Sequence, residues 1–352
     1  MSTTISNTNP RIVAVDCMRF FAIIGVIIIH TIPFRNIQLE HQGQYDLLGV
    51  ILNILARFGV PFFFTISGYF WGLKIRSGQS VMPVSAATAK RLLLILGVWS
   101  LVYLLPYNLG AIFEHGMLGP IKVWYWHLRD LASDPLLIFF EGTHQHLWFL
   151  IALLWAVAIS AVFVRSGLIK LLAAIGIGLY VFGVLSLAYA HTPIGIVIPF
   201  YSLEGPFFGT IFFVTGYVLS GYTPHTRWLK YGIALMLIGY ALHFTEVYLL
   251  WKWWQIRPIH HYVFGTYFIG LGVTMIALCN PSWLRSEVLA KIGRVTLGIY
   301  AGHYIFVEWL EPINPLVLHP VWEIGRVLIV LALSAGVALW LSKSRTLKKF
   351  VT

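Results

Sequence analysis

The stretch Ile12-Val-Ala-Val-Asp16-Cys-Met-Arg19-Phe-Phe-Ala-Ile-Ile-Gly-Val-Ile-Ile-Ile-His30-Thr-Ile-Pro33 decides the fold class. An α-helix needs about 20 mostly apolar residues to cross a bilayer, and this run is long enough. It exceeds the apolar region of an ordinary signal peptide and lacks an Ala-x-Ala cleavage site, so we expect the protein to retain it. We therefore interpret it as a membrane-spanning helix.

The composition of the chain agrees with a protein that lies largely inside a membrane. Of its 352 residues 59% are hydrophobic and 11% are charged, and the mean hydropathy is +0.80. A soluble domain of this size needs far more polar surface. The formal net charge is +11, but the basic residues form short clusters between apolar runs. This pattern is typical of topology signals and not of a nucleic-acid-binding surface.

Ten runs along the chain are apolar and long enough to be membrane helices. We therefore expect an all-α polytopic membrane protein with a single domain over residues 1–352. The expected spans are roughly 12–33, 47–73, 91–112, 146–164, 168–190, 199–221, 229–250, 261–279, 288–309 and 320–342.

The distribution of Lys and Arg orients these spans. With a cytoplasmic N-terminus, fifteen of the 24 Lys and Arg residues lie on inner segments and five on outer segments. Cytoplasmic loops carry an excess of positive residues, so both termini are expected in the cytoplasm. The longest outer loop, 113–145, contains aromatic and histidine side chains that fit either stacking on a sugar or an interfacial helix on the bilayer.

Three polar side chains of the first helix share one face. Arg19 and His30 are eleven residues apart, which leaves about 20° after three turns at 100° per residue, and Asp16 lies within about 60° of both. Ionisable side chains in a membrane face protein or a water-filled cavity and mark functional sites by default. The alternative is a packing salt bridge with a hydrogen-bonded histidine.

The spacing of these side chains suits acyl transfer. Arg19 and His30 are separated by roughly 16–17 Å along the helix, which is comparable to an extended pantetheine arm. A guanidinium at the inner end could bind phosphate or amide oxygens of coenzyme A. Imidazole at the outer end has the pKa needed to accept a hydroxyl proton and to protonate a leaving thiolate.

The same residues carry a family resemblance. The run from Asp16 through Arg19 to His30 resembles the Arg-x10-His signature of the membrane acyltransferase 3 family. Further segments resemble later blocks of that family in the same order. They are Arg57-Phe-Gly-Val-Pro61-Phe-Phe-Phe-Thr-Ile-Ser67-Gly68-Tyr69, His146-Leu-Trp148-Phe-Leu, Phe212-Phe-Val-Thr-Gly216-Tyr-Val-Leu and Gly293-Arg-Val-Thr-Leu-Gly-Ile-Tyr300-Ala-Gly-His303.

The resemblance implies a ten-helix enzyme of the bacterial inner membrane. Such an enzyme takes an acyl group, usually acetyl, from cytoplasmic acyl-coenzyme A and delivers it to an outer acceptor, commonly a glycan or a lipid-linked sugar. By position, His30 would be the catalytic base and Arg19 its partner on the donor side, with Asp16 beside it. No permanently bound cofactor and no metal are expected. Direct transfer and an acyl-histidine intermediate both remain open. The chain resembles stand-alone members such as the O-acetyltransferases of enterobacterial common antigen.

Two further arginines are candidates for binding the donor. Arg57 lies in the middle of the second expected span and either holds the donor or forms an ion pair with Asp16. Arg294 lies near the inner end of the ninth span, where it either contacts phosphates or extends its side chain to the interface.

Five residues are candidates for binding the acceptor. His303 and Tyr300 share a face of the ninth span, and His303 either positions the acceptor or is a hydrogen-bonded structural residue. Glu204 either orients His30 or is a solvated acid at a helix start. Trp148 and His146 either line the site or belong to the interfacial aromatic belt.

A proton-coupled secondary transporter is the alternative function. Helices with buried Asp, Arg and His side chains also suit proton transport, but the sequence shows no paired broken helices in corresponding halves. A non-catalytic scaffold would leave the polar face of the first helix without a purpose.

Overall fold

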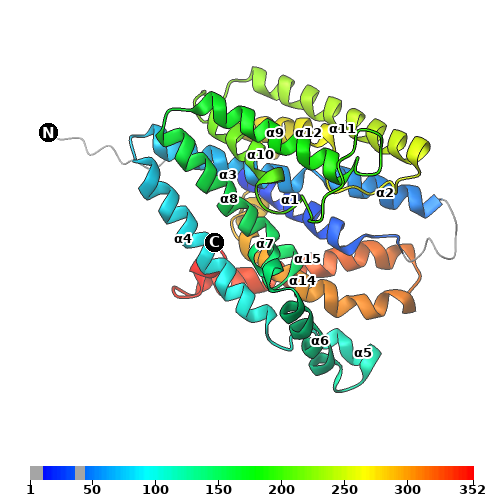
Figure 1. Ribbon diagram of the computed structural model, residues 1–352. Helices are drawn as coiled ribbons and strands as arrows, with labels where there is room; N and C mark the ends of the chain where they lie inside the picture. Colours follow the sequence, from blue (N-terminus) through cyan, green and yellow to red (C-terminus); the bar gives the residue numbers. More distant parts are fainter. Residues whose placement is uncertain (1–10, 36–43) are drawn as a thin grey trace.

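The computed structural model describes residues 11–35 and 44–352, and within these ranges the regular structure is all helical (Figure 1). The longer helices are α1 (Val13–Thr31), α2 (Gln44–Ala56), α3 (Gly59–Arg76), α4 (Val81–Tyr103), α6 (Gly119–Ser133), α8 (Trp148–Arg165), α9 (Ile169–Leu187), α10 (Pro206–Leu219), α11 (Arg227–Trp254), α12 (Phe264–Leu278), α14 (Thr296–Leu310) and α15 (Pro320–Lys343). The short α-helices are α5 (Ile112–His115), α7 (Ile138–Glu141) and α13 (Glu287–Gly293).

Seven helices in the described part of the chain are long and apolar enough to cross a membrane, and α2 and α3 together form one of them. Helices α10 and α12 are also apolar but shorter. The all-α, multi-helix membrane architecture expected from the sequence is therefore confirmed. The number of ten spans and the cytoplasmic position of both termini stay predictions.

Three of the expected spans differ from the helices in the structure. The span at 91–112 is wrong, because α4 begins at Val81 and ends at Tyr103, so that Lys90 and Arg91 lie inside the helix. The spans at 47–73 and 288–309 are each interrupted, the first between α2 and α3 and the second between α13 and α14. Each interruption includes an arginine, Arg57 or Arg294, which faces a cavity described below.

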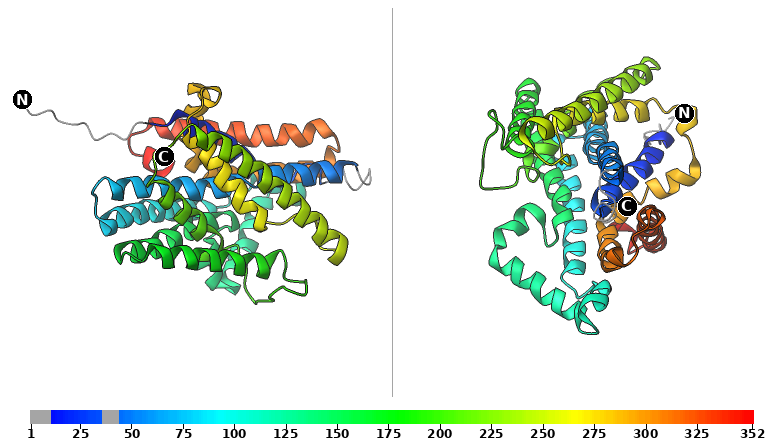
Figure 2. Two further views of the ribbon diagram at one scale, coloured as in Figure 1. Left: turned by 90° about the horizontal axis from the view of Figure 1, so that it is seen from above. Right: turned by 90° about the vertical axis from the view of Figure 1, so that its right-hand side faces the viewer.

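Helix α1 lies at the centre of the bundle, as Figure 2 shows. It contacts α2, α3, α12, α13, α14 and α15. Glycine allows close approaches of this kind, because a Cβ atom at Gly59 would lie 2.6 Å from the carbonyl oxygen of Ala22. Small residues at such contacts let membrane helices pack backbone to backbone. The polar face of α1 is thereby enclosed by protein.

The segment predicted as a long outer loop is largely helical. Helices α5 and α6 project from the rest of the bundle (Figure 1). Tyr125 and Trp126 on α6 are exposed, and Trp124 donates its indole N–H to the carbonyl oxygen of Leu104 at 2.8 Å. Residues 124–127 do not line the cavity around His30. Glu141 and Gln145 of the same segment do line that cavity, so both interpretations of the segment stay predictions.

Candidate active site

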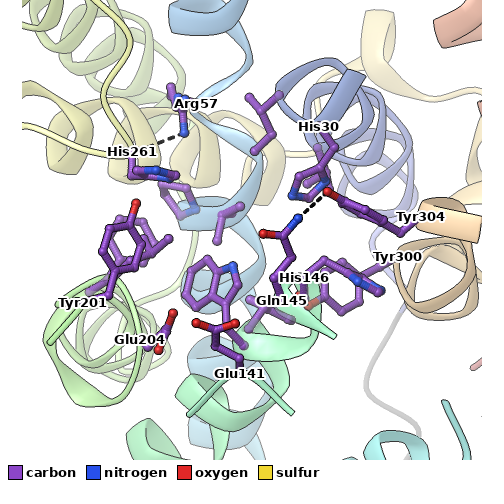
Figure 3. Close-up of a pocket in the computed structure, with 18 of the residues that line it drawn as sticks. His30, Arg57, Glu141, Gln145, His146, Tyr201, Glu204, His261, Tyr300 and Tyr304 are labelled. Atoms are coloured by element: carbon purple, nitrogen blue, oxygen red, sulfur yellow. Dashed lines mark hydrogen bonds between the residues drawn. The ribbon is translucent and has the colours of Figure 1, made fainter. Parts of the chain in front are cut away.

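A cavity of about 370 Å³ surrounds the side chain of His30 at the C-terminal end of α1 (Figure 3). His30 comes from the last turn of α1, and Tyr300 reaches the cavity from α14. The turn that precedes α8 supplies Gln145 and His146. The remaining polar side chains of its wall are Arg57, Glu141, Tyr201, Glu204, His261 and Tyr304.

The hydrogen bonds of His303 fix the tautomer of His30. His303 Nδ1 lies 2.6 Å from the carbonyl oxygen of Tyr300, which can only accept, so Nδ1 carries the proton. His303 is fully buried, where an imidazole is more stable neutral than charged, and its Nε2 then accepts. His30 Nδ1–H donates to that Nε2 at 2.9 Å. The lone pair of His30 therefore resides on Nε2.

The cavity brings together most of the residues predicted to bind the acceptor. His146, Trp148, Glu204 and Tyr300 all line it. His303 does not, because its ring packs beside that of His30, with ring centroids 5.0 Å apart. The structure places His303 as the partner of His30 and not in the cavity wall.

A second cavity of about 300 Å³ lies at the N-terminal part of α1 and is strongly cationic. The predicted donor residues Arg19 and Arg294 both line it. Lys74 from α3 and Arg91 from α4 complete a group of four cations, and the cavity wall has no Asp or Glu side chain. Phosphate groups bind such clusters through charge-assisted hydrogen bonds. From the sequence, Lys74 and Arg91 were counted only among the inner basic residues that orient the spans in the membrane.

Asp16 orients Arg19 at the edge of the cationic cavity. Its two carboxylate oxygens accept from Arg19 Nη1 and from Arg11 Nε, both at 2.8 Å. A Cβ atom at Gly293 would collide with the carbonyl oxygen of Asp16, so only glycine lets α13 approach α1 here. This close contact brings Arg294 to the same cavity as Arg19.

Arg57 lies in the wall of the His30 cavity and not beside Asp16. The ion pair with Asp16, one of the two roles considered for Arg57, is not formed, because Asp16 binds Arg11 and Arg19 instead. Arg57 lines the cavity of His30, and its Nε and Nη2 donate to Asn53 Oδ1 at 2.9 and 2.6 Å. The interruption between α2 and α3 turns this arginine toward His30 and away from the cationic cavity.

Two aromatic side chains separate the two cavities. Phe149 and Tyr300 line both of them, and their ring centroids lie 5.2 Å apart in an edge-to-face arrangement. The Tyr300 hydroxyl donates to the carbonyl oxygen of His146, which fixes the ring. Arg19 and His30 therefore lie on opposite sides of this aromatic partition, joined by about three turns of α1.

A buried polar network supports the wall of the His30 cavity. His146 Nε2–H donates to the carbonyl oxygen of Ala301 at 3.2 Å, so its Nδ1 accepts from His144 Nδ1–H at 2.9 Å. His144 Nε2 lies 2.9 Å from Glu308 Oε1, and the Tyr107 hydroxyl donates to Glu308 Oε2 at 2.6 Å. These bonds join His146, His144 and Glu308 in one continuous chain. The network holds the ring of His146 in place.

The comparison with known families agrees with this geometry. The acyltransferase domain model of the acyltransferase 3 family matches residues 12–343. The chain belongs to this family. The resemblance noted from the run between Asp16 and His30 is thereby confirmed, and the protein is a multi-helix membrane member of an acyltransferase family.

Two curated proteins of Enterococcus faecalis, both named amino-acid racemase, are distantly similar to this acyltransferase-family chain. One is 27% identical over 226 residues, which are 60% of this chain and 28% of the relative. The other is 29% identical over 169 residues, which are 48% of this chain and 22% of the relative. The chain thus spans under a third of the length of these relatives. No solved structure matches the chain.

Glu204, in the wall of the His30 cavity, gives the stability of the fold a testable pH dependence. It lies in the connection before α10, where burial raises its pKa to about 8 (Figure 3). The hydrogen bond that its protonated carboxyl donates to neighbouring Glu141 and the negative charge of Glu141 act in the same direction. Between its ordinary pKa of 4.5 and about 8, the folded protein binds a proton that the unfolded chain has lost. Stability must therefore fall as pH rises through this window.

We expect a smaller loss of melting temperature between pH 6 and pH 9 in Glu204→Gln than in the wild type. The amide carries no charge at either pH, so the contribution of this group disappears. Thermal unfolding of the purified protein in detergent measures the difference. An identical pH dependence in both proteins would show that Glu204 is ionised throughout.

Proposed function

We propose that the protein is an acyl-coenzyme A-dependent O-acyltransferase of the bacterial inner membrane. It would move an acetyl or other short acyl group from the cytoplasmic thioester to a hydroxyl of a cell-surface or periplasmic glycan. Family membership supports the reaction class. One observation carries the rest of the proposal: Arg19 and His30 occupy one helix in two cavities that share Phe149 and Tyr300.

The donor would bind with its phosphates in the cationic cavity. Arg19, Lys74, Arg91 and Arg294 offer several positive charges in a partly desolvated site, as the phosphates of coenzyme A require. The pantetheine arm, which is uncharged, would then pass between Phe149 and Tyr300. Its thioester would arrive beside His30, because the arm and the Arg19–His30 separation have similar lengths.

The chemistry needs a base with a free lone pair, and His30 Nε2 has one. As the acceptor hydroxyl oxygen attacks the thioester carbonyl, its proton moves to Nε2 and the new C–O bond forms. The C–S bond then breaks, and the imidazolium returns the proton to the leaving thiolate. The same lone pair could attack the thioester first, in which case the acyl group passes through His30.

The acceptor would occupy the outer part of the His30 cavity. Trp148 and Tyr201 offer aromatic faces there, and Glu204 and Gln145 offer hydrogen-bonding groups. A sugar ring pairs apolar C–H faces with hydroxyl groups and fits such a surface. This assignment supports a glycan or lipid-linked sugar as the acceptor class.

The activity is tested with the purified protein in proteoliposomes. Acetyl coenzyme A with a labelled acetyl group is supplied on one side and a surface glycan fraction on the other. We expect the label to move into the glycan fraction while free coenzyme A accumulates on the donor side. If the protein neither turns over the thioester nor binds coenzyme A, the proposal is refuted.

His303 is expected to matter through its hydrogen bond to His30. Replacing it with alanine frees the His30 ring to rotate and to change tautomer, which should lower kcat about 10- to 100-fold. His303→Gln should recover part of this loss, because its carbonyl oxygen can accept from His30 Nδ1–H. Steady-state kinetics would measure both variants, with the KM for acetyl coenzyme A unchanged. Equal losses in the two variants would contradict the tautomer argument.

One feature favours a secondary transporter as the second candidate function. The interruptions between α2 and α3 and between α13 and α14 are broken helices, which transporters use to build substrate sites. In this chain each break contains an arginine whose side chain lines a cavity. A transporter would move its substrate without consuming a thioester, so the proteoliposome experiment separates the two functions.

A further inference from the structure

The chain turns sharply directly after His30, and two residues of the turn have an unfavourable backbone conformation. Ile32 has φ 44° and Phe34 has φ 71°, in the left-handed region that favours glycine. Pro33 between them has no N–H and cannot continue α1. Backbone strain of this kind persists only where the surrounding structure holds it. The turn therefore needs support from outside α1.

Helix α15 supplies this support through a buried ion pair. Arg326 Nη2 lies 3.3 Å from Glu323 Oε2, and the two side chains are 2% and 0% exposed. Arg326 Nη2 also donates to the carbonyl oxygen of Thr31, and Phe34 N–H donates to Glu323 Oε2 at 2.9 Å. The ion pair therefore binds the turn on both sides, at Thr31 and at Phe34.

The contact to Thr31 also completes the end of α1. The last carbonyl groups of a helix have no partner within the helix and need one in a membrane. A cation at this end is further favoured by the helix dipole. Arg326 supplies both a hydrogen-bond donor and a positive charge at Thr31, the residue directly after the candidate base His30. A buried ion pair adds little net stability to a fold. Its effect on the position of the turn and of His30 is therefore the more informative effect.

We propose that Glu323 and Arg326 are positioning residues that hold His30 against His303 and toward the cavity. The inference rests on the proposed function of His30. The two residues act through the turn at residues 31–34 and touch no reacting atom. The bond from His30 Nδ1 to His303 is 2.9 Å long, so a small displacement of the turn would break it.

Glu311 provides a matched control for Glu323. It pairs with the other terminal nitrogen of Arg326, Nη1, at 3.0 Å, but its side chain is 59% exposed. We expect Glu323→Gln to lower kcat about 10- to 100-fold with an unchanged KM for acetyl coenzyme A, since misplacement of a reacting group by about 1 Å has such an effect. Glu311→Gln should keep the wild-type kcat.

A second variant tests the proposal independently, in case Glu323→Gln misfolds. Arg326→Lys keeps the charge near the end of α1, but its shorter side chain withdraws the donor that Arg326 Nη2 offers to both Thr31 and Glu323, and it should lower kcat in the same way. In a His303→Ala background, Glu323→Gln should add little further loss, because both changes release the same imidazole. Wild-type kcat in both Glu323→Gln and Arg326→Lys, or fully multiplicative losses with His303→Ala, would overturn the proposal.

An NMR measurement tests the inference without relying on activity. The ¹⁵N shifts of the His30 ring report which nitrogen carries the proton, with His30→Ala used to assign the signal. We expect one tautomer, protonated on Nδ1, in the wild type and Glu311→Gln, and a mixture in Glu323→Gln. A single unchanged tautomer in Glu323→Gln would refute the positioning role. Absent thioester turnover in the wild type would refute the proposed function instead.

Discussion

His30→Ala is expected to abolish acyl transfer while leaving coenzyme A binding intact. General acid–base catalysis contributes about 10²- to 10⁴-fold, and His30 Nε2 is the lone pair positioned for it in the cavity. The donor phosphates would bind on the other side of Phe149 and Tyr300, so the affinity should not change. Release of labelled acetyl from acetyl coenzyme A gives the rate, and isothermal titration with coenzyme A gives the affinity.

His30→Gln is the companion variant to His30→Ala. It keeps a group that can donate to His303 but has no basic nitrogen, so it should be nearly as inactive as the alanine variant. Transfer at a tenth or more of the wild-type rate in either variant would contradict a catalytic role for His30. Loss of coenzyme A binding in both would instead indicate that the residue holds the donor.

Neutralising the cationic cavity is expected to weaken donor binding strongly. A hydrogen bond to a charged group contributes about 1.5–3 kcal/mol, so Arg19→Gln and Arg294→Gln should each raise the Kd for coenzyme A about 10- to 100-fold. Asp16 keeps Arg11 as its partner in Arg19→Gln, which protects the fold. Titration at two salt concentrations should show weaker binding at high salt, because ions screen the charges.

Arg57→Gln is the control for the cationic cavity. This arginine lies in the His30 cavity, on the other side of the aromatic partition, so the Kd for coenzyme A should stay at the wild-type value. Pantetheine, which lacks the phosphates, should bind the wild type and Arg19→Gln equally. Equal weakening of coenzyme A binding by Arg57→Gln and Arg19→Gln would place the donor phosphates elsewhere.

Helical periodicity was sufficient to predict the polar face of α1. The spacing of Asp16, Arg19 and His30 places them on one side of one long helix, and the structure encloses that side in protein. Local spacing along a single helix is independent of how helices pack. For the same reason the all-helical architecture could be predicted from apolar runs alone.

Contacts between helices could not be predicted in this way. Lys74 and Arg91 are ordinary basic residues at or near helix ends in sequence, and only the packing of the helices brings them to the same cavity as Arg19. Arg57 was expected in the middle of a continuous helix, whereas the interruption before α3 decides which cavity it faces. The left-handed turn at Ile32 and Phe34 carries no glycine and so left no signal in the sequence.

A structure of the His30→Ala variant with acetyl coenzyme A, determined by cryo-electron microscopy in nanodiscs, tests the central claim most directly. We predict the phosphates among Arg19, Lys74, Arg91 and Arg294, the pantetheine arm between Phe149 and Tyr300, and the thioester beside residue 30. Acetyl coenzyme A bound at another place, or with its thioester on the same side of the aromatic partition as its phosphates, would contradict the account.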